Sequence, residues 1–256
     1  MAVQTPRTTD ADDASTTGLY CYGVAAAAGA RPLEGGLGGA PVEPVVHADL
    51  AALTSRVPAG TVRARRRDLL AHWEVLGAAF ERGTVLPLRF GIVFDDEDAL
   101  VREFLAPRHD ELARLLRELS GRAELRVAAH YRDDALLAEI VRESPRVAKL
   151  REATNGAPAG HPALIELGEL VAAEVQSRTA RDARGLVERL RPLAERYHVD
   201  DEPIEYQVLR ASFLVKGDRR PKFEAELERI AAEQAGRMDV KLVGPLPPHS
   251  FVEVGR

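Results

Sequence analysis

The segment that decides the fold is Glu124-Leu125-Arg126-Val127-Ala128-Ala129-His130-Tyr131. Its aliphatic, β-branched and aromatic residues predict a β-strand. The later elements are expected in the order helix, helix, strand, helix and strand, at residues 133–150 with a break at Pro145, 162–197, 204–216, 221–234 and 237–243. A strand, helices, strand, helix and strand in succession suit a split βαβ arrangement. We therefore expect residues 121–256 to form a ferredoxin-like α+β domain.

The residues before this segment also mix short strands and helices. We expect strands at 19–24 and 42–46, a strand followed by a turn at 84–94, a flexible loop at 25–41, and helices at 47–55, 61–82 and 95–119. In the helix that ends before Gly83, a spacing of three and four residues places four apolar side chains on one face, namely Leu69, Trp73, Leu76 and Phe80. The chain is thus predicted to be α+β with two tandem domains: a polar, disordered tail at 1–17, a modified α+β domain at 18–120, and the ferredoxin-like domain.

Composition narrows the functional classes. The chain has 256 residues, of which 45% are hydrophobic and 29% charged, with a formal net charge of −5. This acidic balance argues against a dedicated surface for nucleic acid or for an anionic lipid membrane. A single cysteine, Cys21, excludes an internal disulfide and a cysteine-based zinc site. No apolar run approaches the roughly 18 residues of a membrane span, and the polar start is no secretory signal, so a cytoplasmic location is expected.

The motifs that carry chemistry are weak in this chain. GGLGGA at residues 35–40 matches neither the dinucleotide nor the P-loop pattern, and the acidic run at 95–98 lacks the EF-hand spacing and instead suits a helix N-terminus. No HExxH or GxSxG sequence occurs. His72 is interpreted as a structural histidine bonded to a carbonyl or carboxylate, and Cys21 as buried and inert. We expect no enzymatic activity, no metal and no cofactor.

Arg89 is the most informative single residue. It stands within the apolar run Val85-Leu86-Pro87-Leu88-Arg89-Phe90-Gly91-Ile92-Val93-Phe94, where an unpaired buried charge is costly. Arg89 must therefore either reach solvent or pair with a carboxylate. We predict the pair, with Glu124 or Glu74 as the first candidates.

Three segments, in this order and spacing, resemble the gas vesicle protein F/L family (GvpF/GvpL). The first is an aromatic-Tyr-Gly start, Leu19-Tyr20-Cys21-Tyr22-Gly23-Val24. The second is a block that contains His72, the proline-containing apolar run at 85–91, and residues 121–127. The third is the proline-rich ending at 244–252. The family usually carries aromatic residues within the ending, where this chain has Leu246 and His249.

The resemblance implies a minor structural or assembly protein of gas vesicles, without enzymatic activity. Its implied partner is the small hydrophobic major shell protein GvpA, and other gas vesicle accessory proteins are further candidates. The implied location is the cytoplasm and the gas vesicle. The candidate partner-binding residues lie in the first domain, and they are Trp73, Phe80, Pro87, Arg89, Phe90 and Gly91.

Two other classes stay open at this point. Ferredoxin-like domains host many functions, so a ligand-binding or enzymatic protein is an alternative, which a deep polar pocket around His72 or His130 would favour. An RNA-binding module is the other, and exposed aromatic residues beside arginine on a sheet face would favour it.

Overall fold

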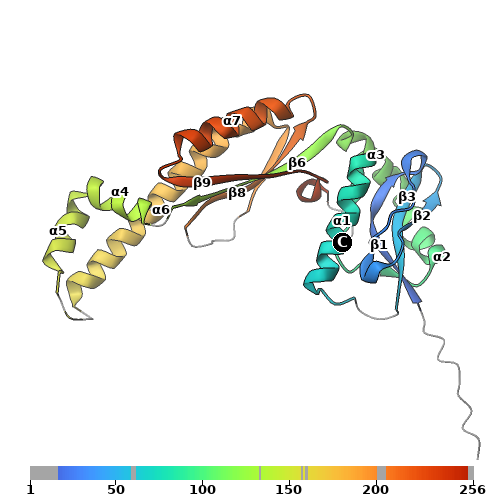
Figure 1. Cartoon of the computed structure of the whole chain (residues 1–256), viewed down its shortest axis with the longest axis horizontal. Coiled ribbons are helices and arrows are strands. Elements are labelled where there is room, and N and C mark those ends of the chain that lie inside the picture. The colour runs from blue at the N-terminus through green and yellow to red at the C-terminus, as the bar shows by residue number, and fades with distance from the viewer. Residues whose placement is uncertain are drawn as a thin grey trace, which may run out of the picture. The chain divides into compact units, whose positions relative to one another are not determined.

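The computed structural model of the chain divides into two compact units, one up to Glu118 and one from Leu119 onward. The structure describes residues 17–58, 62–132, 134–156, 158, 161–200 and 206–252. The tail predicted at 1–17 lies outside the described residues, except for Thr17. The predicted α+β class is confirmed, since each unit holds one antiparallel sheet with helices (Figure 1).

The sheet of the first unit has the order β2-β3-β1-β4, and β5 also pairs with β1. Its strands are β1 (Thr17–Ala26), β2 (Glu43–His47), β3 (Leu50–Pro58), β4 (Val85–Pro87) and β5 (Val93–Phe94). The central strands β1 and β3 pair along their whole length.

The helix expected at 47–55 is wrong. Those residues end β2, turn at Ala48, which has a positive φ of 52°, and begin β3. Residues 50–55 are all buried, because β3 lies between β1 and β2 and is covered on both faces. A continuous apolar run of this length does not distinguish a doubly covered strand from a buried helix.

The helices of the first unit are α1 (Arg66–Arg82), α2 (Glu97–Leu100) and α3 (His109–Leu119), with a π-helical turn at Val101–Leu105. Asp96 caps α2, because its carboxylate accepts the Ala99 N–H at 2.7 Å, as the acidic run at 95–98 predicts. The glycine-rich segment at 35–40 is not an unstructured loop. It contains a 3₁₀ turn, Leu37–Gly39, and buries Leu37.

The sheet of the second unit has the antiparallel order β7-β8-β6-β9. The strands are β6 (Arg122–Tyr131), β7 (Arg196–Val199), β8 (Gln207–Lys216) and β9 (Met238–Leu246), and the helices are α4 (Ala135–Glu143), α5 (Pro145–Ala153), α6 (Pro162–Leu190) and α7 (Arg220–Glu233). Helices connect β6 to β7 and β8 to β9, and each connected pair has one other strand between it. This is the connectivity that a split βαβ arrangement requires.

The long helix predicted to reach Tyr197 ends earlier, at Leu190. A 3₁₀ turn containing Pro192 follows, and Tyr197 lies in the edge strand β7. Proline can occupy the first turn of a helix but not continue one, so Pro192 marks this boundary.

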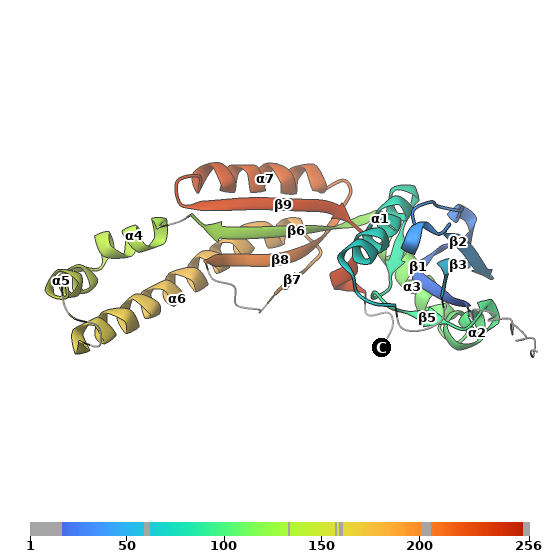
Figure 2. The same cartoon turned by 60° about the horizontal axis from the view of Figure 1, so that its bottom comes forward.

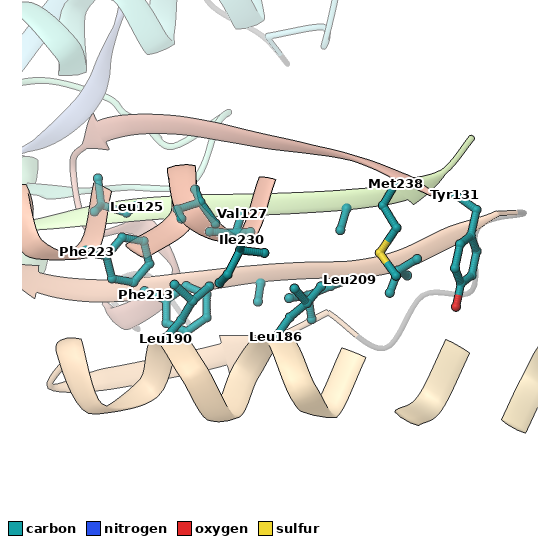
Figure 3. Close-up of a cluster of buried hydrophobic side chains, with 14 of the residues drawn as sticks. Leu125, Val127, Tyr131, Leu186, Leu190, Leu209, Phe213, Phe223, Ile230 and Met238 are labelled. Carbon is teal, nitrogen blue, oxygen red and sulfur yellow. The ribbon is translucent and has the colours of Figure 1, made fainter. Parts of the chain in front are cut away.

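Alternate residues of β6 build the core of the second unit. Leu125, Val127, Ala129 and Tyr131 form one buried cluster with residues of α6, α7 and β8, among them Leu186, Leu190, Phe213, Phe223 and Ile230 (Figure 3). Both long helices therefore cover the same face of this sheet.

A helical extension continues beyond the end of this sheet, and it consists of α4, α5 and the first half of α6 (Figures 1 and 2). The break at Pro145 is where predicted, since it separates α4 from α5. Among the described residues, no helix is long and apolar enough to cross a membrane.

The proline-rich ending is ordered and packed, as far as Val252. It leaves β9, makes a 3₁₀ turn at His249–Phe251, and buries the Phe251 side chain. The buried Glu124 carboxylate accepts hydrogen bonds from the Ser250 N–H at 2.7 Å and the Ser250 hydroxyl at 2.9 Å. The ending is thereby attached to the central strand β6.

Candidate partner-binding surface

A turn at 88–91 connects β4 to the short strand β5 and is bound to β1 at both ends. The Leu88 N–H donates to the Tyr22 carbonyl at 2.9 Å, and the Cys21 N–H donates to the Ile92 carbonyl at 3.0 Å. Gly91 has a φ of +96°, a conformation that strains residues with a side chain. The backbone of this apolar run is therefore held in a defined loop.

Two buried side chains fasten the same turn from beneath. His72 of α1 contacts the Leu88 carbonyl through Nε2 at 3.2 Å and the Tyr20 hydroxyl through Nδ1 at 2.8 Å. A carbonyl can only accept, so we assign the proton to Nε2, and Nδ1 accepts from Tyr20. The Tyr20 oxygen in turn accepts the Gly91 N–H at 3.2 Å. We call the hydrogen-bonded series Leu88–His72–Tyr20–Gly91 the neutral clasp.

Burial keeps this clasp uncharged. The His72 side chain is only 1% exposed. Loss of hydration lowers the pKa of its imidazole to about 4, although the bond to the Leu88 carbonyl acts in the opposite direction. Burial likewise raises the pKa of the Tyr20 hydroxyl well above its usual range. Both groups are therefore neutral near pH 7, and His72 is the structural histidine that the sequence predicts.

Tyr22 makes a second set of bonds beside the clasp. Its hydroxyl donates to Ser55 Oγ at 3.1 Å and accepts the Leu37 N–H at 2.8 Å. Ser55 donates onward to the Pro41 carbonyl at 2.8 Å. These bonds tie the glycine-rich segment to the centre of the sheet.

Apolar and cationic side chains of α1 and of the turn reach the surface. On α1, Leu70 is 50% exposed and Trp73 is 38% exposed. The half-buried Phe90 ring lies 5.7 Å from the His72 ring, which in turn lies 6.2 Å from the Trp73 ring. Arg89 is exposed on the turn itself. We call Leu70, Trp73, Arg89 and Phe90 the turn surface.

The predicted helix face needs correction. The buried side chains of α1 are His72, Val75 and Leu76, so Trp73 lies at the edge of the packed face and not at its centre. An apolar spacing identifies a face, but the burial of a polar residue such as His72 shifts that face.

The six candidate residues occupy different environments. Trp73, Arg89 and Phe90 gather at the turn, and Gly91 shapes its backbone. Phe80 is half-buried against the core near the C-terminal end of α1. Pro87 is buried in β4 opposite Gly23, so it contributes to the sheet and not to a binding surface.

The physical reason that predicts an ion pair at Arg89 does not hold, because an exposed arginine incurs no burial cost. The Glu124 carboxylate accepts hydrogen bonds from Arg126 at 2.7 Å, from Ser212 at 3.0 Å and from Ser250. Glu74 is exposed on α1.

Sequence reasoning missed the contributions of Tyr20, Tyr22 and Ser55. The aromatic start of β1 is the available signal, since a buried tyrosine needs a hydrogen-bond partner. Nothing in the sequence indicates which partner each hydroxyl finds. Cys21 between them is buried as predicted, and burial raises the pKa of its thiol to about 12.

His72 is a structural residue of the first unit. Both ring nitrogens of His72 are engaged in the protein interior, so it does not line an open polar pocket. Across the described ranges, no group of three or more His, Cys, Asp or Glu side chains is arranged to hold a metal ion. The fold and the site define a two-unit α+β protein whose first unit presents a fixed surface turn.

Comparison with known proteins identifies the family. Residues 18–253 match the family model described as gas vesicle synthesis protein GvpL/GvpF, so the chain belongs to this family and has a gas vesicle-related role. A gas vesicle protein F of Streptomyces sp. (strain CB03234) is 37% identical over 240 residues, which cover 91% of this chain and 99% of the relative. A gas vesicle protein L of the same strain is 30% identical, covering 92% of each.

A solved structure agrees with the fold of the whole chain. The crystal structure of the gas vesicle protein GvpF from Anabaena sp. PCC7120 matches with a TM-score of 0.81 at 25% identity, covering 94% of this chain and 100% of that one. The two Streptomyces relatives bear the names of gas vesicle proteins and not of enzymes.

Proposed function

We propose that this protein is a minor structural or assembly protein of gas vesicles, and that it binds the hydrophobic major shell protein GvpA in the cytoplasm during vesicle formation. Family membership carries the gas vesicle role. The turn surface supports the binding step, because it combines exposed Leu70 and Trp73 with the cationic Arg89. An apolar centre with a charged rim is the usual composition of a protein interface.

The proposed role has a physical rationale. A shell subunit with exposed apolar surface aggregates before it assembles, unless another protein covers that surface. The neutral clasp fixes the turn before binding, so little conformational entropy is lost when a partner docks. The proposal includes no catalytic step, no cofactor, and neither nucleic acid nor a lipid membrane as partner. Other gas vesicle accessory proteins remain further candidate partners.

Direct binding tests the proposal. Purified wild-type protein and the variant Leu70→Glu are titrated against GvpA, with Val46→Glu as the matched control. Val46 is a similarly exposed aliphatic residue, 57% exposed, on β2 of the same unit. We expect Leu70→Glu to weaken binding at least ~10-fold, since it introduces a charge into the apolar centre, and Val46→Glu to have little effect.

A deletion strain completes the test. In a host that forms gas vesicles, removal of the gene is expected to abolish or deform the vesicles, and Leu70→Glu is expected to restore them less well than Val46→Glu. Normal vesicles in the deletion strain, together with no binding to GvpA, would refute the proposal. Equal effects of the two variants would place the binding surface elsewhere.

A further inference from the structure

The helical extension of the second unit contains an apolar groove that none of the preceding assignments explains. It has a volume of about 440 Å³. Helices α4, α5 and α6 all contribute to it, and its lining residues are Asp134, Leu137, Ala138, Ile140, Val141, Val147, Arg151, Leu167 and Val171. The apolar members are all Ala, Val, Leu or Ile. This volume falls in the range of ligand sites, which is about 300–1,000 Å³.

The groove exists because the extension is built from small side chains. No Phe, Tyr or Trp occurs from residue 134 to residue 175. The sheet-covered core of the same unit is filled by aromatic residues such as Phe213 and Phe223 (Figure 3). On α6, the neighbouring Ile165 is 58% exposed. The extension therefore leaves aliphatic surface in contact with solvent.

An ionic clamp joins two of the helices that line the groove. Arg178 of α6 donates to Glu139 at 2.6 Å and to Glu143 at 2.7 Å, and both carboxylates belong to α4. Arg237, just before β9, donates to Asp182 of α6 at 2.6 Å and to Glu139 at 3.0 Å. The clamp fastens α4 to α6 and to the sheet, so the groove is preformed.

The two charged residues that line the groove differ from neighbouring arginines in their ion pairing. Arg142 and Arg146 in the same extension are paired, with Glu143 at 3.0 Å and with Glu166 at 2.8 Å. Over the described part of the chain, neither the Asp134 carboxylate nor the Arg151 guanidinium takes part in an ion pair or hydrogen bond. Asp134 precedes the first residue of α4, and Arg151 lies in the last turn of α5. One acidic and one basic group are thus left to orient an occupant.

We propose that this groove binds an amphipathic α-helix of a partner protein. The helix would insert aliphatic residues at positions i, i+3 or i+4, and i+7, which is how helices occupy apolar grooves. A basic residue of that helix would pair with Asp134 and an acidic one with Arg151. The inference goes beyond the proposed function, because the groove lies in the second unit and needs no contact with the turn surface.

Selection from a library tests the groove without knowledge of the natural partner. The probe is a displayed library of about 20-residue helices with randomised aliphatic and charged positions, selected on the full-length protein. Ala138→Trp supplies the counter-selection, since Ala138 lines the groove at an exposed position and a tryptophan there fills it. Ala173→Trp, at an exposed position of α6 that does not line the groove, is the matched control.

The expected result is a set of amphipathic binders. Their affinity should fall at least ~10-fold with Ala138→Trp and less than about twofold with Ala173→Trp. Asp134→Lys with Arg151→Glu should weaken the same binders, and reversal of the two matching charges in the peptide should restore the affinity.

Four outcomes would overturn the inference. They are no enrichment above the counter-selected background, binders that Ala138→Trp does not affect, saturable binding of dodecanoate in place of helices, and a dimer in light scattering that Ala138→Trp dissociates. The third result would indicate a small-molecule site, and the fourth a second copy of this chain.

Discussion

The two units hold one turn and one helical extension in place by opposite physical means. In the first unit the neutral clasp holds the turn at 88–91 through a carbonyl, an imidazole and a phenol, none of them charged near pH 7. In the second unit the ionic clamp holds the helical extension through Arg178, Arg237 and carboxylates, with the Tyr131 hydroxyl donating to Asp182 at 2.5 Å. Side chains that are similarly buried in the two units should therefore respond differently to substitution and to pH.

The neutral clasp and the ionic clamp differ in the free energy that is lost when one member is removed. Loss of one member of a neutral network leaves an unsatisfied donor or acceptor, which costs about 1–3 kcal/mol. Loss of one member of a buried ion pair leaves an uncompensated charge, which costs about 3–5 kcal/mol. The two units can be followed separately, because the chain's single tryptophan, Trp73, lies in the first unit.

The largest expected effect is in the ionic clamp. The Arg178 side chain is buried against Glu139, so Arg178→Met should lower the free energy of unfolding of the second unit by about 3–5 kcal/mol. Urea denaturation followed by far-ultraviolet circular dichroism measures this, while Trp73 fluorescence should report an unchanged first unit. The control is Arg181→Met, which changes an exposed arginine of the same helix and should stay within about 0.5 kcal/mol. Equal effects of both substitutions would show that the clamp does not hold the extension.

As the pH falls, the first unit should lose stability before the second. The pKa of His72 is about 4 when folded and about 6.5 when unfolded, so the unfolded chain binds this proton first as pH falls. The first unit should therefore lose up to about 3 kcal/mol between pH 7 and pH 4. In the second unit, hydrogen bonds from Arg237 and Arg178 lower the pKa of Glu139. The ionised Glu139 carboxylate therefore stabilises the fold at pH values above the ordinary pKa of a carboxyl group. That stabilisation is lost only as the pH falls below about 4.5.

Denaturation at about pH 7, 5.5 and 4.5 checks the order of these losses. His72→Gln, which removes the titrating group, should abolish most of the slope seen by Trp73 fluorescence across this range. The half-buried His109 acts in the opposite direction, since hydrogen bonds to the carboxylates of Asp110 and Asp49 raise its pKa. Its contribution is present at low pH and fades as the pH rises. A second unit that destabilises before the first would contradict the assignment.

A single hydroxyl tests the neutral clasp. Tyr20→Phe removes the donor to His72 and the acceptor of the Gly91 N–H, so the first unit should lose about 2 kcal/mol. Tyr197→Phe, at an exposed tyrosine of the second unit, is the control and should have little effect. If the clasp fixes the turn surface, Tyr20→Phe should also increase hydrogen exchange at the Gly91 amide. An unchanged exchange rate would mean that the turn is held by β1 alone.

The sequence predicts regular elements better than it predicts their partners. The order of elements in the second unit follows from periodicity, because alternate residues of β6 and the apolar stripes of its helices face one core. Periodicity does not predict the strand β3 or the early end of α6. A strand covered on both faces loses its alternation, and a helix end at Pro192 is hidden inside an otherwise helical pattern.

Polar networks are the least predictable part. The sequence treats Arg89 as a charge that is costly to bury, whereas Arg89 is exposed, and it gives no indication that the Glu124 carboxylate accepts from Ser250. The segments that resemble the gas vesicle family are joined in pairs, Tyr20 with Gly91 and Glu124 with Ser250. Such long-range contacts depend on the fold, which brings together residues far apart in sequence, and no local spacing encodes them.

The smallest expected effect concerns a carboxylate held mainly by neutral donors, an intermediate between the clasp and the clamp. Glu124 is fully buried, and it accepts from Arg126, from Ser212, and from both the N–H and the hydroxyl of Ser250. Ser250→Ala removes one of these donors and leaves the others, so the second unit should lose only about 1 kcal/mol. The measurement is thermal unfolding by circular dichroism, with Ser177→Ala at an exposed position of α6 as the matched control. A loss of about 4 kcal/mol would instead show that the hydroxyl of Ser250 is essential for compensating the charge of Glu124. The C-terminal segment would then be held mainly by compensation of a buried charge, as the helical extension is by the ionic clamp.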